Sequence, residues 1–530
     1  MVPRQFNSKN YINILFDHPI PRQVTRRFPL LLTFAIFLIV AAPLNASINP
    51  KRITRKLVYL EPNTTAVDLQ RQLDRLKQDL LSRSVSINLQ QAVEQSLTNN
   101  PTLAEQYSQI QNEQWNLIAV RRSWYPKLLV TGPAGGNIMS FQSVSNKNST
   151  YTSKILESKS RKLNFTNTIN TAPNTINLNW TFFDPSRGPS INASSENLRA
   201  QQLLFDVAAR DLVLETQLAY FALQEKQELV KNYEQVLNSI TKAVNQTEAL
   251  FIAGNLSITE VEQIRTQQFQ QLTLLTETYR QLVSAAAKLS EAMALPVGSL
   301  VTTQDNLALI GKWSLSEAET LQQAEQLREE IQASLATASS FGWQARGLFN
   351  SYWPSFSTFA SGTFSHTDIA GGKPGSERIT NTQAHQWSGA VGIGFSWSIF
   401  DGGIKAAEAQ AKQAKENQFT NKAARQRLSV AREVESAYAN YQVTQLGLVS
   451  AKQQIKSAQK ASEAVGERFK VGYSEITTVI QTYRQYQQAA AAFSSSIREF
   501  NNSVASLYRY SASWPDGALP LLQKRVQSLK

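Results

Sequence analysis

Reactive side chains are scarce in this sequence, and they are not arranged for catalysis. The chain of 530 residues has no cysteine and three histidines: His18 near the N-terminus, and His366 and His385 within polar stretches. The segment Gly371–Pro374 lacks the spacing, and the Ser or Thr after lysine, of a phosphate-binding loop. Adjacent acids such as Glu329–Glu330 are typical of a solvated helix face. We therefore expect no enzymatic activity, no cofactor and no metal site.

Charge and cysteine usage exclude further classes of protein. The formal net charge is +13, but the basic residues are scattered and no basic run is interleaved with aromatic residues. We therefore predict no nucleic-acid partner. Without cysteine the chain has neither disulfides nor the acylated cysteine of a bacterial lipoprotein.

The N-terminal region predicts export. Arg26 and Arg27 precede an apolar stretch, Phe28–Ala42, which is followed by Pro43 and by the small residue Ala46. This order is typical of a secretory signal peptide cut near Ala46. A membrane anchor is the alternative, but the stretch is shorter than the roughly 20 apolar residues that cross a bilayer. No later segment resembles a membrane-spanning helix, so we expect any later crossing to be made by strands.

The two halves of the chain are similar at a shift of about 218 residues. Four patterns recur in the same order: Ser123–Pro126 with Ser351–Pro354, Trp180–Asp184 with Trp397–Asp401, Tyr220 with Tyr438, and Phe251–Gly254 with Phe469–Gly472. Two unrelated helical domains of similar composition are the alternative explanation. We divide the chain into a signal peptide (1–46), an N-terminal extension (47–86) with a helix over 69–81, a first repeat (87–296), a linker (297–314), a second repeat (315–510) and a C-terminal tail (511–530).

Each repeat predicts a helix, two strands, a very long helix, a turn and a shorter helix. The first helix is expected from Asn88, a capping residue, to Arg122, and its counterpart over 315–352. Residues 190–253 contain no proline or glycine and would span about 96 Å as a helix. Their counterpart is 405–471, and the return helices are expected over 256–294 and 474–507. Apolar residues spaced by three and four predict a coiled-coil seam, for example Val230, Tyr233, Leu237, Ile240 and Val244.

The predicted strands have one large apolar face and one small polar face. Val391, Ile393 and Phe395 alternate with Gly or Ser, and the stretch 176–182 alternates in the same way. A soluble sandwich would also show this pattern. The export signal and the aromatic residues near one strand end favour lipid, with four predicted membrane-interface residues: Trp180, Phe183, Trp397 and Phe400. The polar connections, 140–173 and 366–386, are expected to be surface loops.

The predicted strands are too few to enclose a pore within one chain. Two strands in each half give four, whereas even a narrow barrel needs about eight. Several copies must therefore contribute to one barrel.

An ordered set of motifs over about 88–507 resembles the TolC-type outer-membrane efflux proteins, also called outer membrane factors. The set consists of Leu89–Val93, Ser96–Leu97, Asn99–Pro101, Tyr125–Pro126, the two Phe-Asp strand ends and Arg468–Ser474. The resemblance implies a mainly α fold with a membrane β-barrel part: a homotrimer with a twelve-stranded barrel in outer-membrane lipid and an α-helical periplasmic tunnel. It also implies a passive exit duct of tripartite efflux or type I secretion, joined by a periplasmic adaptor to an inner-membrane transporter. The alternative is an exported structural or adhesive coiled-coil protein without a channel.

The resemblance also places the candidate sites. In this family the adaptor docks on the tips of the helix hairpins, which here give the contact candidates Gly254, Asn255, Ser257, Arg468, Gly472, Tyr473 and Ser474. Both glycines also suit helix ends, so simple capping is the alternative role. Many relatives have an aspartate constriction six and nine residues after the second tip glycine, where this chain has Thr478 and Gln481. Together with Glu260, six residues after Gly254, these are the candidates for the periplasmic constriction. Glu260 is the only carboxylate at an equivalent place, so we expect no strong cation-binding ring.

Overall fold

The computed structural model describes residues 65–132, 138–146, 163–296, 298–372, 380–515 and 517–529. The predicted signal peptide lies outside these residues. The chain divides into two compact units: unit 1 comprises 1–103, 208–327 and 430–530, and unit 2 comprises 104–207 and 328–429. Each half of the sequence contributes to both units.

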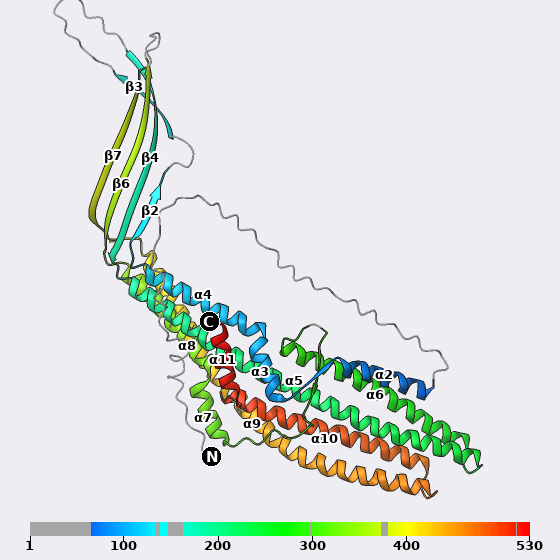
Figure 1. Cartoon of the computed structure of the whole chain (residues 1–530). Helices are drawn as coiled ribbons and strands as arrows, with labels where there is room; N and C mark the ends of the chain where they lie inside the picture. Colours follow the sequence, from blue (N-terminus) through cyan, green and yellow to red (C-terminus); the bar gives the residue numbers. More distant parts are fainter. Residues whose placement is uncertain are drawn as a thin grey trace, which may run out of the picture. The chain divides into compact units, whose positions relative to one another are not determined.

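Unit 2 contains an antiparallel sheet that is built from both repeats. Its strands are β2 (Lys127–Thr131), β3 (Ile138–Asn146), β4 (Leu163–Phe183), β6 (Ser355–Gly372) and β7 (Thr380–Ser396). β6 lies between β4 and β7, while β2 and β3 both pair with β4 (Figure 1). Residues of β4 that pair with β3 also pair with β6, so β2 and β3 share the other edge of β4. The sheet therefore has the four predicted strand positions, one of which is occupied by both β2 and β3.

The surface loops predicted between the strands were too long. β4 begins at Leu163, β6 continues to Gly372 and β7 begins at Thr380, so most of 140–173 and 366–386 lies in strands. These stretches have only scattered large apolar residues, such as Phe141, Phe165 and Ile369, but they are rich in threonine, whose branched side chain suits a strand. Pairing with the neighbouring strand also satisfies the backbone hydrogen-bonding groups of these stretches. The alternation of apolar side chains does not predict this pairing.

The helices of unit 2 pack through small and aromatic side chains. They are α4 (Pro101–Arg122), α8 (Glu329–Asn350) and the first parts of α5 (Arg187–Ile252) and α9 (Ile404–Lys470). Tyr107 of α4 packs edge-on against Phe205 of α5, with ring centroids 6.4 Å apart. Phe341 of α8 stacks on Phe419 of α9 at 5.5 Å.

Unit 1 contains the two long helix hairpins. α5 is followed by α6 (Ile258–Ala292), and α9 by α10 (Ile476–Tyr510). All five residues of the predicted seam are buried: Val230, Tyr233, Leu237, Ile240 and Val244. The two hairpins also pack on each other near their tips, where Ile240 and Ile264 of the first share a core with Phe469 and Val479 of the second. The predicted long helices and return helices are thus confirmed.

The first helix of each repeat is divided, contrary to prediction. Asn88 caps α3 (Leu89–Asn99) as expected, its side chain accepting from the backbone N–H of Gln91 at 2.8 Å. The helix stops at Asn100, because Pro101 has no N–H and its ring crowds the preceding residue. In the second repeat α7 (Glu317–Leu327) is separated from α8 by Arg328.

Segments outside the repeats complete unit 1. The N-terminal extension forms α2 (Ala66–Ser82), which includes the predicted helix, and β1 (Ser84–Ile87), which pairs in parallel with β5 (Leu300–Thr303) of the linker. Leu73 of α2 is buried against α5 and α6. The C-terminal segment contains a further helix, α11 (Ala518–Leu529), which contacts α3. The sequence predicted neither the parallel pair nor α11.

Candidate functional site

The two hairpin tips share one backbone turn. Gly254 and Gly472 have φ of +75° and +81°, a conformation that side chains disfavour. In the first tip the N–H of Gly254 bonds to the carbonyl of Phe251 at 2.9 Å and that of Asn255 to Leu250 at 2.9 Å. The second tip repeats both bonds, from Gly472 to Phe469 at 3.0 Å and from Tyr473 to Arg468 at 2.8 Å. This is the Schellman motif, which satisfies the last carbonyls of a helix.

The helices that leave the tips begin differently. Ser257 caps α6, and its backbone N–H donates to the carboxylate of Glu260 at 2.6 Å. α10 begins after Glu475, whose side chain makes no such cap bond. Glu260 therefore has a structural role at the start of α6, and its place in a constriction stays a prediction. Thr478 and Gln481 are exposed on the first turns of α10.

Apolar side chains are exposed at both tips. Ile252 at the end of α5 is 84% exposed, and Val471 and Tyr473 beside the second glycine are 67% and 79% exposed. Arg468, Asn255 and Ser257 are also exposed, and Ser474 is partly exposed. The sequence did not single out Ile252 or Val471. Phe251 and Ile258 at the first tip are also exposed, whereas Phe469 at the second tip is buried, and the sequence pattern does not separate these cases.

The predicted interface aromatics lie at one end of the sheet. Phe183 pairs with Phe356, and Ser355 pairs with Ser396, so the ends of β4 and β7 and the start of β6 are at the same level. Trp180 donates from Nε1 to the carbonyl of Trp124 at 2.8 Å. Trp397 makes the equivalent bond to Tyr352 at 2.9 Å. Both repeats thus tie the strand end to the Pro-containing turn, whose exposed Trp124, Tyr125 and Trp353 were not predicted as interface residues.

The aspartate of each Phe-Asp motif organises the turn into the long helix. Asp184 accepts from the backbone N–H and the hydroxyl of Ser186 at 2.9 and 2.7 Å. Asp401 accepts from the backbone N–H groups of Gly403 and Lys405 at 2.9 and 3.1 Å, and from the Tyr352 hydroxyl at 3.1 Å. Desolvation raises the pKa of Asp401, but the backbone donors of Lys405 and Gly403, the Tyr352 hydroxyl and the charge of Lys405 together outweigh it, so the net pKa is lowered.

A cation lies over the same aromatic turn in each repeat. The guanidinium carbon of Arg187 is 4.3 Å from the ring centre of Trp124, and the ammonium of Lys405 is 5.4 Å from that of Tyr352. Arg187 also donates to the carbonyl of Thr181 at 2.8 Å, and Lys405 to that of Ser351 at 3.1 Å. These contacts hold the start of each long helix against the strand end.

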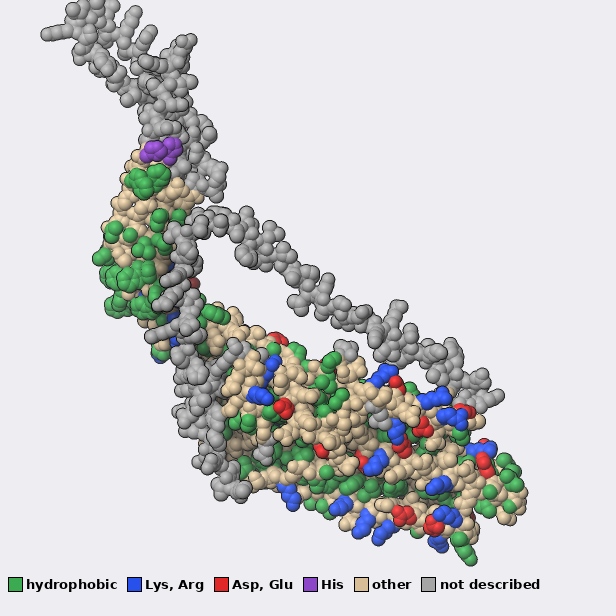
Figure 2. Space-filling model, in the orientation of Figure 1, with side chains coloured by type: hydrophobic (Ala, Val, Ile, Leu, Met, Phe, Trp, Pro, Cys, Tyr) green, Lys and Arg blue, Asp and Glu red, His purple; other side chains and the backbone are tan. Residues whose placement is uncertain are grey.

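One face of the sheet exposes large apolar side chains. Val391, Ile393 and Phe395 of β7 are 82%, 75% and 70% exposed, and Ile176 and Leu178 of β4 are exposed as well. Figure 2 shows hydrophobic side chains gathered over this part of the strands. The register places these residues on one face, as the alternating pattern predicted. An apolar surface of this kind requires a partner, which is lipid or protein.

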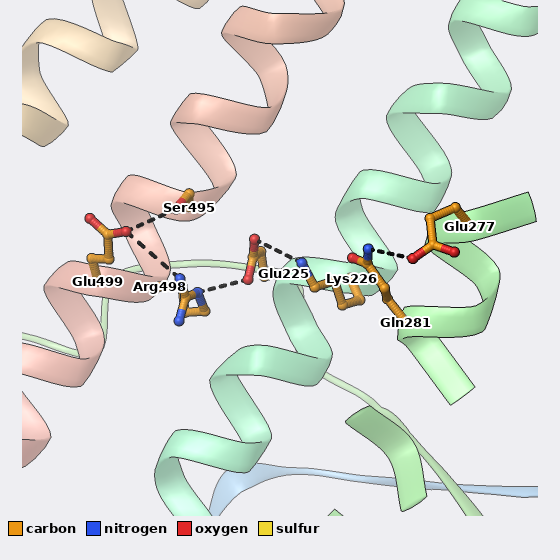
Figure 3. A network of polar contacts seen from close by, with 7 residues as sticks. All are labelled: Glu225, Lys226, Glu277, Gln281, Ser495, Arg498 and Glu499. Carbon is orange, nitrogen blue, oxygen red and sulfur yellow. Dashed lines mark hydrogen bonds and ion pairs between the residues drawn. The ribbon is translucent and has the colours of Figure 1, made fainter. Parts of the chain in front are cut away.

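An ionic network around the buried carboxylate of Glu225 joins the two hairpins within unit 1 (Figure 3). Glu225 of α5, 6% exposed, lies 2.7 Å from Nε of Arg498 of α10 and 3.3 Å from the ammonium of Lys226. Arg498 in turn lies 3.7 Å from Glu499, which accepts from Ser495 at 3.0 Å. This network was not predicted, because Glu225 and Arg498 are distant along the chain and charged helix residues are usually solvated.

Comparison with known proteins identifies the family. The sequence profile described as outer membrane efflux protein matches residues 92–295 and 320–513, which are most of the two repeats. The chain belongs to the outer membrane efflux protein family. The predicted family resemblance is thereby confirmed. Within the described residues, no helix is both long enough and apolar enough to cross a membrane.

Relatives of the efflux protein family share the sequence only distantly. The chain is 24% identical over 335 residues to the outer membrane protein TolC of Escherichia coli K12, a match over 60% of this chain and 65% of TolC. The fold is similar to that of the CmeC outer membrane channel of Campylobacter jejuni, with 15% identity, a TM-score of 0.65 and coverage of 84% of this chain and 90% of that one. The MtrE outer membrane channel of Neisseria gonorrhoeae gives 16% identity, a TM-score of 0.60 and coverage of 80% and 89%. The predicted fold class, with two repeats of strands and long helices, is confirmed by these matches.

Proposed function

We propose that this chain is an outer-membrane channel-tunnel, the passive exit duct of a tripartite efflux or type I secretion system. The observation that carries the proposal is a sheet with four strand positions and one exposed apolar face. Among the described residues, no strand pairs with the outer edge of β7 or of β2 and β3. Backbone groups at such edges need partners inside a bilayer, and four strand positions are too few to close a pore.

The proposed assembly is a homotrimer in which sheets from three copies close one barrel in outer-membrane lipid. Trp180, Phe183, Trp397 and Phe400 would lie at the membrane interface, where amphipathic rings are favoured. The long helices would continue the duct into the periplasm. The duct itself carries out no covalent chemistry, and the transporter supplies the energy.

The tips are proposed as the contact surface for a periplasmic adaptor. Exposed Ile252, Val471 and Tyr473 supply apolar area, and Arg468 supplies a guanidinium beside it. Apolar and arginine side chains at the centre of a surface are typical of protein interfaces. The inner-membrane transporter would be reached through the adaptor.

Heat modification tests the assembly. The full chain, extracted in detergent from the outer-membrane fraction, should migrate as a trimer when unheated and as a monomer after heating, and should form channels in lipid bilayers. A detergent-independent soluble rod would instead support the rival structural or adhesive coiled-coil protein.

Substitution of a glycine tests the tips. Gly472→Leu should reduce export and adaptor crosslinking while trimers still insert. Gly447→Leu is the matched control, because Gly447 lies within α9 and has open space around its Cβ position. Equal loss of export in both variants, or no loss in Gly472→Leu, would contradict the assignment of the tips.

A further inference from the structure

Two histidines face each other across β6 and β7. His366 and His385 are direct register partners. Their Nδ1 atoms are 3.2 Å apart, and their ring centroids are 4.6 Å apart with 32° between the planes. In Figure 2 the histidines of the described residues are the purple patch on the strands. The channel function uses neither residue.

Two aromatic side chains lie beside the histidine pair. Phe364 stacks on His385 with a centroid distance of 6.2 Å and an angle of 10°, and Phe364 also contacts Trp387 at 4.8 Å. By strand alternation these four residues share the face of Val391. The His385 ring therefore packs against both His366 and Phe364, and packing of this kind restricts the orientation of a ligand.

The separation of the two nitrogens suits one shared metal ion. Zinc binds imidazole nitrogen at about 2.0–2.1 Å, so two nitrogens at a tetrahedral angle lie about 3.3–3.4 Å apart. The observed separation of 3.2 Å is close to this distance. Neutral imidazole suits zinc, copper and nickel ions, whereas magnesium and calcium prefer oxygen ligands.

We propose that His366 and His385 bind one divalent transition-metal cation of the zinc, copper and nickel class. Among the residues that the structure describes, no group of three or more His, Cys, Asp or Glu could hold a metal. The pair therefore supplies two ligands, and water or another added ligand completes the coordination. Such an ion would clamp β6 to β7 and stabilise this end of the sheet.

The competing arrangement is a direct hydrogen bond. With neutral rings, one Nδ1–H donates to the other Nδ1, and no metal is needed. Metal binding needs the lone pairs of both Nδ1 atoms, so the donating ring moves its proton to Nε2 through solvent. The pair cannot adopt both arrangements at once, so a measurement of metal binding distinguishes them.

Equilibrium dialysis of the full, untagged chain in detergent against zinc, copper or nickel chloride tests the proposal. We expect one ion per chain and no comparable uptake of magnesium. His366→Gln or His385→Gln should each weaken binding on the order of tenfold or more, because one of two nitrogen ligands is lost. His18 lies in the predicted signal peptide and is not substituted in any of these variants.

A matched control moves one imidazole to the other face of β7. His385→Gln combined with Gln386→His keeps the number of histidines, but successive strand residues point to opposite faces. This double variant should bind as weakly as His385→Gln while keeping the far-ultraviolet circular dichroism of the unsubstituted chain. Binding of one ion per chain with unchanged affinity in the double variant, or no binding of any of the three ions by the unsubstituted chain, would overturn the proposal.

Discussion

The two helix hairpins end in the same turn but have different surroundings. Gly254 and Gly472 make equivalent backbone hydrogen bonds, whereas only the first tip has a carboxylate cap, from Glu260. The first hairpin also carries α2, whose Leu73 is buried between α5 and α6 and whose Lys77 pairs with Glu234 at 2.8 Å. The repeats therefore share backbone geometry that requires glycine, while side-chain chemistry has diverged.

The largest expected effect concerns α2, because it packs on the first hairpin. Leu73→Ala should destabilise the helices by about 2–3 kcal/mol through a lost core contact and the cavity left behind. Leu76→Ala is the control, because Leu76 is on the same helix but 59% exposed. Thermal unfolding followed by circular dichroism measures both. Equal midpoints for the two variants would show that α2 does not stabilise the hairpin.

Substitutions at the two strand-to-helix junctions should have smaller effects on stability, and these effects should differ between the repeats. Asp401→Ala should lower the unfolding midpoint more than Asp184→Ala, because Asp401 accepts from two backbone N–H groups and from the Tyr352 hydroxyl, whereas Asp184 accepts from one backbone N–H group. Since the pKa of Asp401 is lowered, its contribution is present above its ordinary pKa and should be lost as pH falls below about 4. Unfolding midpoints across pH test this, with Asp401→Asn as the neutral control. A larger cost for Asp184→Ala would reverse the comparison.

The tip glycines should respond alike. Gly254→Ala and Gly472→Ala should each cost about 1 kcal/mol, because the left-handed backbone is strained for alanine. No atom lies within 4 Å of either added Cβ, so no clash adds to the strain. Gly447→Ala, in a helix interior, should instead be neutral or stabilising. Unfolding midpoints that differ between the two tip variants would show that the turns are not equivalent.

The smallest effect concerns cations at the tips. Divalent or trivalent cations should block single-channel conductance of the unsubstituted chain only weakly, because Thr478 and Gln481 are uncharged and Glu260 is engaged as a cap. Thr478→Asp with Gln481→Asp should increase the block, and Thr478→Asn with Gln481→Asn is the uncharged control. Strong block of the unsubstituted channel at low cation concentration would refute the expected lack of a cation-binding ring.

Local patterns predicted the elements that repeat. The three-and-four spacing of Val230, Tyr233 and Leu237 predicted a buried seam, and the alternation of Val391, Ile393 and Phe395 predicted one exposed apolar face. The tip glycines were predicted by their place between helical periods. These signals are local, because each depends on residues within a few turns of helix or one strand.

The tertiary structure decided which distant residues meet. The polar strand extensions, the parallel pairing of β1 with β5, the contact of Glu225 with Arg498 and the facing of His366 and His385 all depend on pairings that no local period records. Local patterns were enough to predict the two repeats, their long helices and the apolar side of each strand, because backbone geometry sets the side-chain period. The strand register and the pairing of distant segments could not be predicted in this way, since they follow from the sum of many contacts between segments far apart in sequence.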